Sequence, residues 1–317
     1  MAVTFFFVLG GFSMTLGYKD RVLKPEFSYK EYITRRSIKF YPLHWLCLLV
    51  AFPLSLLSFN LNKIPALFAN AALLQTWIPI QDVYFSFNWV SWYLADTMFF
   101  AAMFPLVFKL IVTSSNKRRV AVALLFAIIY AGVALLLPVE KYHAILYISP
   151  YMRLTDFVFG IYLALLYFKL KEKSSKWWNG SVVGQLVIVA LIVLLVVESC
   201  ILPKNFRLVA PVYWLLVALL ILMSSLIRRP DGVVIMLEDK LLLRLGELSF
   251  PIFLTHQIVL RYTNLLFDKI LHFENDIIYI SITLGLTIVL SQFVDKNILK
   301  PITQWLTKRI QPSMTAR

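Results

Sequence analysis

The segment Arg35–Phe59, RRSIKFYPLHWLCLLVAFPLSLLSF, begins with two arginines and continues as a mostly apolar run. A bilayer core about 30 Å thick needs roughly 20 apolar residues in a helix, so Ile38–Phe59 is long enough to cross a membrane. Lys and Arg concentrate beside the cytoplasmic ends of such spans. The segment therefore predicts a transmembrane helix and its direction.

Apolar runs of this kind recur along the chain, and because lipid leaves backbone groups unsatisfied unless they pair internally, each is predicted to be helical. Hydrophobic residues make up 60% of the chain and charged residues 15%, with a mean hydropathy of +0.77. We predict an all-α fold, a polytopic transmembrane helix bundle of about nine spans. The predicted spans are Thr4–Tyr18, Ile38–Phe59, Trp92–Val112, Val120–Pro138, Ile148–Phe168, Val182–Cys200, Leu208–Ile227, Leu248–Phe267 and Ile277–Phe293.

Lys and Arg alternate between the gaps that separate these runs. Residues 19–39 hold seven of them and residues 60–91 hold one, and basic and non-basic gaps alternate to the basic tail at 296–317. This pattern predicts a cytoplasmic C-terminus and an N-terminus on the outer side. The net charge of +14 then reflects sidedness and contact with anionic membrane lipids, and nucleic acid is not a predicted partner.

The longest outer gap contains an apolar stretch, Pro65–Ile80, that is too short to span. We predict a short re-entrant or interfacial helix there. Two interpretations apply to the aromatic residues at its borders: a belt at the lipid headgroups, or a platform on which a sugar ring stacks. These residues are Trp77, Trp89, Trp92 and Tyr93.

Ionisable residues inside predicted spans are costly and often serve a site. Arg153 and Asp156 are three residues apart, so they share a helical face and can form either a structural ion pair or part of a functional site. His256 lies near the middle of its span, where it is a packed histidine or a general base. Asp96 lies one turn into its span from the outer side.

Six short motifs follow one another along the chain. They are Phe5–Phe12 (FFFVLGGF), Arg35–Pro42 (RRSIKFYP), Asn88–Leu94 (NWVSWYL), Arg153–Gly160 (RLTDFVFG), Leu245–His256 (LGELSFPIFLTH) and the region from Asp295 to Pro301. In this order they resemble the motifs of the bacterial membrane acyltransferase family 3. The resemblance covers nearly the whole chain, and we expect residues 1–317 to form one integral-membrane acyltransferase-3-like domain with no separate soluble domain.

The family includes polysaccharide O-acetyltransferases, nodulation-factor acetyltransferases and glucan succinyltransferases. The resemblance implies an O-acyltransferase of the cell inner (plasma) membrane that moves an acyl group, acetyl in the first instance, from cytoplasmic acyl-CoA to a hydroxyl of a cell-envelope or exported polysaccharide. Arg35, Arg36 and Lys39 would bind the coenzyme phosphates, unless they serve sidedness alone. Trp92 and Asp96 would contact the acceptor substrate, and no metal is expected.

Departures from the family pattern set the expectations for catalysis. Gly10 replaces a family serine, Lys39 replaces an arginine, and Thr97 stands where the family has a glutamate. The family has ten spans, and its first helix carries a histidine taken to be catalytic. We expect this chain to lack that helix and to be N-terminally truncated, so His256, with Arg153 and Asp156, becomes the candidate catalytic set. The alternative is a transporter or a non-catalytic membrane scaffold, that is, an inactive truncated acyltransferase homologue.

Overall fold

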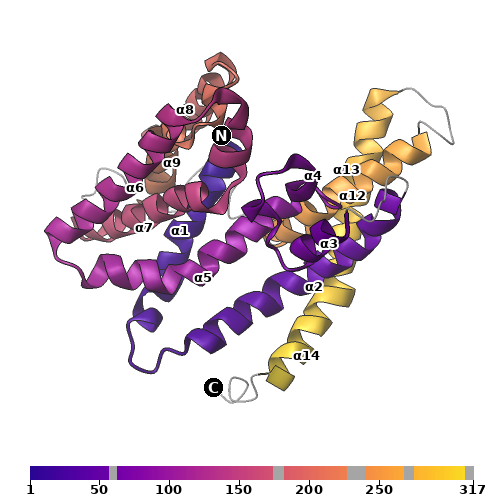
Figure 1. Ribbon diagram of the computed structural model, residues 1–317, viewed down its shortest axis with the longest axis horizontal. Helices are drawn as coiled ribbons and strands as arrows, with labels where there is room; N and C mark the ends of the chain where they lie inside the picture. Colours follow the sequence, from indigo (N-terminus) through magenta and orange to yellow (C-terminus); the bar gives the residue numbers. More distant parts are fainter. Residues whose placement is uncertain (57–62, 174–181, 227–239, 268–274, 311–317) are drawn as a thin grey trace. The chain divides into compact units, whose positions relative to one another are not determined.

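The computed structural model describes residues 1–56, 63–173, 182–226, 240–267 and 275–310. Within these ranges all regular elements are helices (Figure 1), which confirms the predicted all-α fold. The chain forms two compact units, each assembled from separate stretches. Unit 1 comprises Met1–Phe27 and Phe99–Leu242, and unit 2 comprises Ser28–Met98 and Leu243–Arg317.

Unit 1 is a group of long helices with short helical turns between some of them. Its core includes Val8, Phe12, Leu163, Tyr213 and Val217. The helix α1 packs along α7, and α8 packs beside α9 (Figure 1). The helices are α1 (Ala2–Val22), the C-terminal part of α5 (Ser91–Thr113), α6 (Asn116–Leu136), α7 (Pro150–Lys173), α8 (Val182–Ile201) and α9 (Trp214–Leu226), with single turns at Val139–Lys141, His143–Ile148, Phe206–Leu208 and Ala210–Tyr213.

Two glycines allow α1 and α7 to touch backbone to backbone. A Cβ added at Gly11 would lie 2.0 Å from the carbonyl oxygen of Phe157, and one added at Gly160 would lie 2.0 Å from that of Val8. Small residues at such crossings let transmembrane helices approach closely, and the association then rests on van der Waals packing. These two glycines therefore set the position of α7, which carries Arg153 and Asp156.

We expect Gly11→Ala and Gly160→Ala each to lower the free energy of unfolding by roughly 1–3 kcal/mol, because the new methyl group meets backbone that cannot move aside. Gly17→Ala on the same helix as Gly11 is the matched control, since nothing lies within 4 Å of its added Cβ. The measurement is the midpoint of thermal unfolding in detergent. An equal shift for Gly11→Ala and Gly17→Ala would contradict the close crossing.

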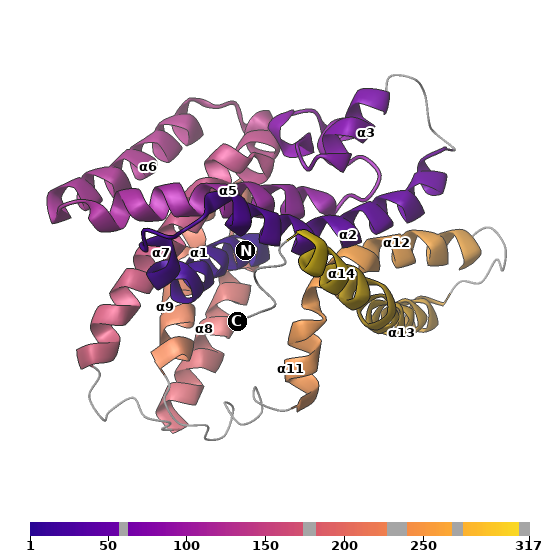
Figure 2. The same ribbon diagram turned by 90° about the horizontal axis from the view of Figure 1, so that it is seen from below.

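Unit 2 is built around α2 and α12. Its core includes Leu43, Cys47, Leu94, Leu254 and Ile258. The helices α12 and α13 run side by side (Figure 2), and α2 packs on α12 and α14. The elements are α2 (Tyr29–Leu56), α3 (Ile64–Ala71), a turn at Gln75–Trp77, α4 (Gln81–Tyr84), the N-terminal part of α5, the C-terminal part of α11 (Lys240–Glu247), α12 (Ser249–Leu266), α13 (Asp276–Val294), a π-helical turn at Asp295–Leu299 and α14 (Lys300–Ile310).

Over its described residues, each of the nine predicted apolar runs falls mainly in a helix, and six helical stretches there are long and apolar enough to cross a membrane. The helix α12 is not among the six, and its sequence contains the polar residues His256, Gln257 and Arg261. Several helices extend past the predicted apolar runs. The helix α1 has 21 residues and extends past the apolar run, and the basic tail continues α13 as a helix to Ile310. Residues 57–62, 174–181, 227–239, 268–274 and 311–317, including parts of the basic gaps, lie outside the described residues.

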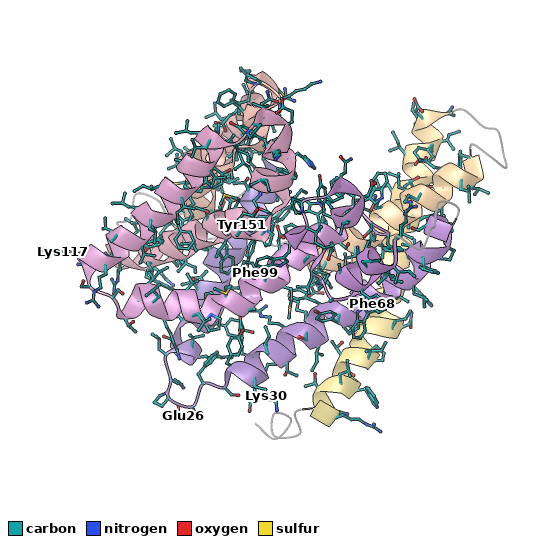
Figure 3. All side chains as sticks on the ribbon, in the orientation of Figure 1. Glu26, Lys30, Phe68, Phe99, Lys117 and Tyr151 are labelled. Atoms are coloured by element: carbon teal, nitrogen blue, oxygen red, sulfur yellow. The ribbon has the colours of Figure 1, made fainter. Side chains whose placement is uncertain are left out.

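The surface of α6 shows where lipid is expected to lie. Its outward side chains are apolar, and only a small share of the helix is buried. Lys117, at the start of α6, extends away from the helices (Figure 3). A polar end and an apolar body suit a helix that has lipid as its solvent. The exposed apolar residues of α6 include Val120, Leu124, Leu125, Ile128 and Ile129.

The predicted short helix is present as α3, but the chain then turns into two further short helical turns instead of one continuous helix. Three side chains of α2 (Tyr41, His44 and Trp45) bond to the carbonyl oxygens of Asn70–Ala72 at 2.8–3.0 Å. Carbonyl groups at a helix C-terminus lack intrahelical partners, and away from water they need others. The α2 side chains therefore fix the end of α3.

Candidate functional site

Arg153 and Asp156 form the ion pair that their spacing predicted. An Nη1 atom of Arg153 lies 2.8 Å from Oδ2 of Asp156, and the two side chains are 1% and 0% exposed. Burying two charges costs several kcal/mol per ion, which their attraction offsets only when the remaining polar atoms are also bonded. The neighbours of the pair supply such bonds.

Three other elements of unit 1 bond to this pair. Arg153 donates from Nε to the carbonyl oxygen of Tyr147 (2.8 Å) and from Nη1 to Oγ1 of Thr4 (3.1 Å). The indole N–H of Trp214 donates to Oδ1 of Asp156 at 2.6 Å. The pair thus joins α1, α7, α9 and the turn His143–Ile148. No sequence signal pointed to Thr4 or Trp214, because they lie far from α7 in the chain.

His256 projects from α12 in a defined tautomer. Its Nδ1 atom lies 2.7 Å from the carbonyl oxygen of Phe253 and 3.2 Å from that of Ile252. A carbonyl oxygen only accepts hydrogen bonds, so Nδ1 must carry the hydrogen, and Nε2 of the neutral ring then holds the lone pair. The imidazole is half-buried. It is therefore equipped to accept a proton at Nε2.

The segment just before α5 is fastened to α12. A guanidinium nitrogen and two amide groups make the connection, all within unit 2. The bonds are Arg261 Nη1 to the carbonyl oxygen of Phe87 (2.7 Å), Asn88 Nδ2 to the carbonyl oxygen of Leu254 (3.0 Å) and the backbone N–H of Val90 to Oε1 of Gln257 (3.2 Å). Residues 87–90 are consequently held against the helix that carries His256.

Two polar residues of the motif Asn88–Leu94 have a structural role. Asn88 and Ser91 are buried, and Oγ of Ser91 accepts from Nε2 of Gln75 (3.2 Å) and from Nδ2 of Asn70 (3.4 Å). Asn70 also donates to the carbonyl oxygen of Ser86 at 3.0 Å. These amides tie the residues around α3 to the start of α5. No sequence pattern indicated the pairing between Asn70 and Ser91.

Trp92 and Asp96, predicted to contact substrate, lie one helical turn apart on α5. Trp92 is 7% exposed and Asp96 is fully buried. The neighbouring Tyr93 ring meets Phe253 edge-on at 5.0 Å, so this part of α5 packs against α12 near His256. The contact of Trp92 and Asp96 with an acceptor stays a prediction.

The basic cluster Arg35, Arg36 and Lys39 lies in the N-terminal half of α2. Arg35 pairs with Glu31 at 3.9 Å, with both side chains about half exposed, an arrangement that contributes little to stability. The guanidinium of Arg36 lies 5.6 Å from the Tyr32 ring, and Lys39 is exposed. The cluster places three positive charges within about one turn of the helix.

The predicted site residues thus belong to both units. Arg153 and Asp156 are part of unit 1, and the remaining six are part of unit 2. Within unit 2 the elements α2, α5 and α12 that carry them pack on one core. Among the described residues, no group of three His, Cys, Asp or Glu side chains could hold a metal ion.

Comparison with known proteins identifies the family. The acyltransferase domain model matches residues 1–295 of the chain. The chain belongs to the acyltransferase 3 family. This membrane acyltransferase is similar to acyltransferase MdmB of Streptomyces mycarofaciens, with 26% identity over 284 residues, which are 83% of this chain and 68% of that protein. No solved structure matches it. The family expected from the six motifs is confirmed, and with it acyl transfer as the activity of a multi-pass membrane protein.

Proposed function

We propose that this acyltransferase moves an acetyl group from cytoplasmic acetyl-CoA to a hydroxyl of a cell-envelope or exported polysaccharide. The observation that carries the proposal is the half-buried His256, whose Nδ1 is held by backbone carbonyls so that Nε2 is the basic nitrogen. A neutral imidazole is the commonest general base near neutral pH. The family membership supplies acyl transfer, and the site supplies the base.

The chemical step follows from that nitrogen. Nε2 of His256 accepts the proton of the acceptor hydroxyl while the hydroxyl oxygen attacks the thioester carbonyl carbon. The C–S bond of the tetrahedral intermediate then breaks, and the coenzyme leaves as a thiolate that takes the proton back from the imidazolium. The products are an O-acetyl ester and free coenzyme A. Thus the imidazole ends the cycle neutral, as it began.

Arg153 and Asp156 act in this proposal as positioning residues. Each is fully buried and bonded to protein partners, so neither is expected to exchange protons with substrate. Their network holds α1, α7 and α9 together within unit 1. Trp92 and Asp96 are proposed to shape the acceptor side, within the first two turns of α5.

The donor is proposed to bind through its phosphates to Arg35, Arg36 and Lys39. Charge-assisted hydrogen bonds to phosphate are shorter and stronger than neutral ones. The basic cluster lies on the side of the membrane that the Lys and Arg pattern assigns to the cytoplasm, where acyl-CoA is made. Donor and acceptor would thus approach from opposite faces.

Replacing Arg36 and Lys39 together with Gln is expected to weaken acetyl-CoA binding by about 1.5–3 kcal/mol for each charge-assisted hydrogen bond that is removed. The measurement is equilibrium binding of labelled acetyl-CoA to the protein in detergent. Lys117→Gln, which removes one charge from the start of α6, is the matched control and should leave binding unchanged. If the unmodified protein, the double variant and Lys117→Gln bind acetyl-CoA with equal affinity, Arg36 and Lys39 do not bind the donor. Their role would then be limited to setting the orientation of the protein in the membrane.

The polysaccharide acceptor is tested in cells. The protein is expressed in a bacterial host from which the host's own polysaccharide O-acetyltransferases have been deleted, and the purified envelope polysaccharide is examined by proton NMR. New O-acetyl signals that disappear after mild alkali are expected. Polysaccharide without such signals, from cells in which the protein is folded in the membrane, would contradict this acceptor.

A further inference from the structure

Unit 2 contains a pocket of about 420 Å³ beside the segment that precedes α5. This volume falls in the range of roughly 300–1,000 Å³ that small-molecule sites occupy. Three of its lining residues are aromatic, and others carry charged or amide groups. Those that matter here are Lys63, Gln81, Asp82, Phe85, Trp89 and Arg261.

Arg261 is held in place on one side of this pocket. One nitrogen of its guanidinium donates to the carbonyl oxygen of Phe87, and Phe87 itself has a φ of 58°, a left-handed conformation that costs a non-glycine residue energy. The Phe87 ring stacks on Phe52 at 6.1 Å and is 4% exposed. A strained backbone conformation such as that of Phe87 persists only where the surrounding structure holds it in place. Such residues are often found at ligand-binding sites.

Trp89 provides an open aromatic face at the same place. Its side chain is 53% exposed, although the indole lies two residues from the buried Phe87. The ring centre lies 5.9 Å from the guanidinium carbon of Arg261 and 6.4 Å from the Phe85 ring. The Arg261 guanidinium, itself held by Phe87, lies close to the indole of Trp89 and holds it in place. The exposed indole can therefore bind a ligand that stacks on an aromatic face.

A flat apolar ring next to carboxylate, amide and guanidinium groups matches the chemistry of a sugar. One face of a pyranose ring is made of C–H groups that stack on an aromatic face, while its hydroxyl groups both donate and accept hydrogen bonds. Asp82 offers acceptors, Arg261 offers donors and Gln81 offers both. A lipid chain would use the aromatic side chains but would form no hydrogen bond with these three polar groups.

We propose that this pocket binds a sugar ring of the acceptor glycan, with Trp89 as the stacking platform. The inference rests on the proposed function for its choice of glycan. The gap from residue 60 to 91 is on the outer side by the Lys and Arg pattern, which is the side of the acceptor. Arg261 and His256 lie on one helix about 7.5 Å apart along its axis, since five residues rise about 1.5 Å each. The pocket and the proposed base thus share one helix, α12.

The structure also selects Trp89 among the aromatic residues at this border. Trp92 is buried, and Trp77 is exposed but does not line the pocket. Trp77→Ala therefore makes the same truncation on an exposed tryptophan of the same segment. It is the matched control for Trp89→Ala.

The first test is kinetic. The acceptor is a set of oligosaccharides released by mild acid from the envelope of the expression host, and acetyl-CoA is the donor. Trp89→Ala is expected to raise the acceptor KM about tenfold, because one aromatic stacking contact is removed, with kcat and the acetyl-CoA KM unchanged. Trp89→Phe should restore most of the affinity, and Trp77→Ala should have no effect. An unchanged acceptor KM for Trp89→Ala, or an equal rise for Trp77→Ala, would overturn the proposal.

The second test does not depend on turnover. The protein is labelled with 5-fluorotryptophan in lipid nanodiscs, the resonance of Trp89 is assigned with Trp89→Phe, and the same oligosaccharides are added. A saturable shift of this resonance supports the pocket even if no acetyl transfer occurs, in which case the proposed function fails and the sugar site stands. No shift with the oligosaccharides, or a shift with a short alkyl glycerol alone, would overturn the sugar site.

Discussion

His256→Gln is expected to lower acetyl transfer by about 10²–10⁴-fold, the usual contribution of a positioned general base. Glutamine has nearly the size of histidine and keeps a polar group on α12, but it cannot take up the proton of the acceptor hydroxyl. The measurement is the initial rate of acetyl ester formation with saturating acetyl-CoA. Acetyl-CoA binding should be unchanged, because the basic cluster on α2 is intact.

The control for His256 is another histidine. His143→Gln makes the same change in unit 1, where the imidazole stacks on Tyr147 at 5.4 Å. Its rate should stay within about twofold of the unmodified protein, since the His143 imidazole takes no part in the proposed proton transfer and is not among the described groups that bond to the Arg153–Asp156 pair. If His256→Gln keeps the full rate and is correctly folded, His256 is not the base, and the mechanism proposed above is wrong.

Arg153→Ala is expected to lower the free energy of unfolding by about 3–5 kcal/mol, the usual cost of stranding one partner of a buried ion pair. Asp156, fully buried in α7, would keep Trp214 but lose its counter-charge. The measurement is the midpoint of thermal unfolding in detergent, with intrinsic tryptophan fluorescence as the signal. The size of the loss depends on the isolation of the charge and not on the volume removed.

The double change Arg153→Met with Asp156→Leu is the control for this interpretation. It removes both charges and keeps similar volume, so it should be more stable than Arg153→Ala, although the indole N–H of Trp214 loses its acceptor. A double variant less stable than the single one would contradict the stranded-charge explanation. The rate of acetyl transfer by a stable double variant tests whether the Arg153–Asp156 pair acts as a positioning element. If this rate equals that of the unmodified protein, the pair has no positioning role.

The fold was predictable because its strongest signals are local. Each apolar run is long enough to be recognised without knowledge of the rest of the chain. The exact ends were less predictable. Residues Lys19–Val22 extend α1 past the apolar run, and residues Lys300–Ile310 of the basic tail form a helix. Helical conformation continues beyond the apolar run wherever side chains such as Lys and Arg tolerate it.

The candidate site was predictable only in part, for the same reason. The pairing of Arg153 with Asp156 follows from a spacing of three on a helix. Its bond to Thr4 joins residues 149 apart in the chain, and that of Asn88 to Leu254 joins residues 166 apart. Nothing in a single sequence records such contacts. Trp89 is exposed and lies just before the first residue of α5, whereas Trp92 is buried and lies within α5. This difference likewise depends on where the helix begins, which the sequence does not show.

The proposed reaction is tested most directly with inverted membrane vesicles from cells that express the protein. Acetyl-CoA labelled in the acetyl group is added to the outside of these vesicles, which is the cytoplasmic face, and label is counted in the polysaccharide fraction before and after mild alkali. We expect alkali-labile label in polysaccharide, reduced at least about a hundredfold in His256→Gln vesicles. Label recovered only as free acetate, or polysaccharide labelled equally in both preparations, would contradict the transfer reaction and its base.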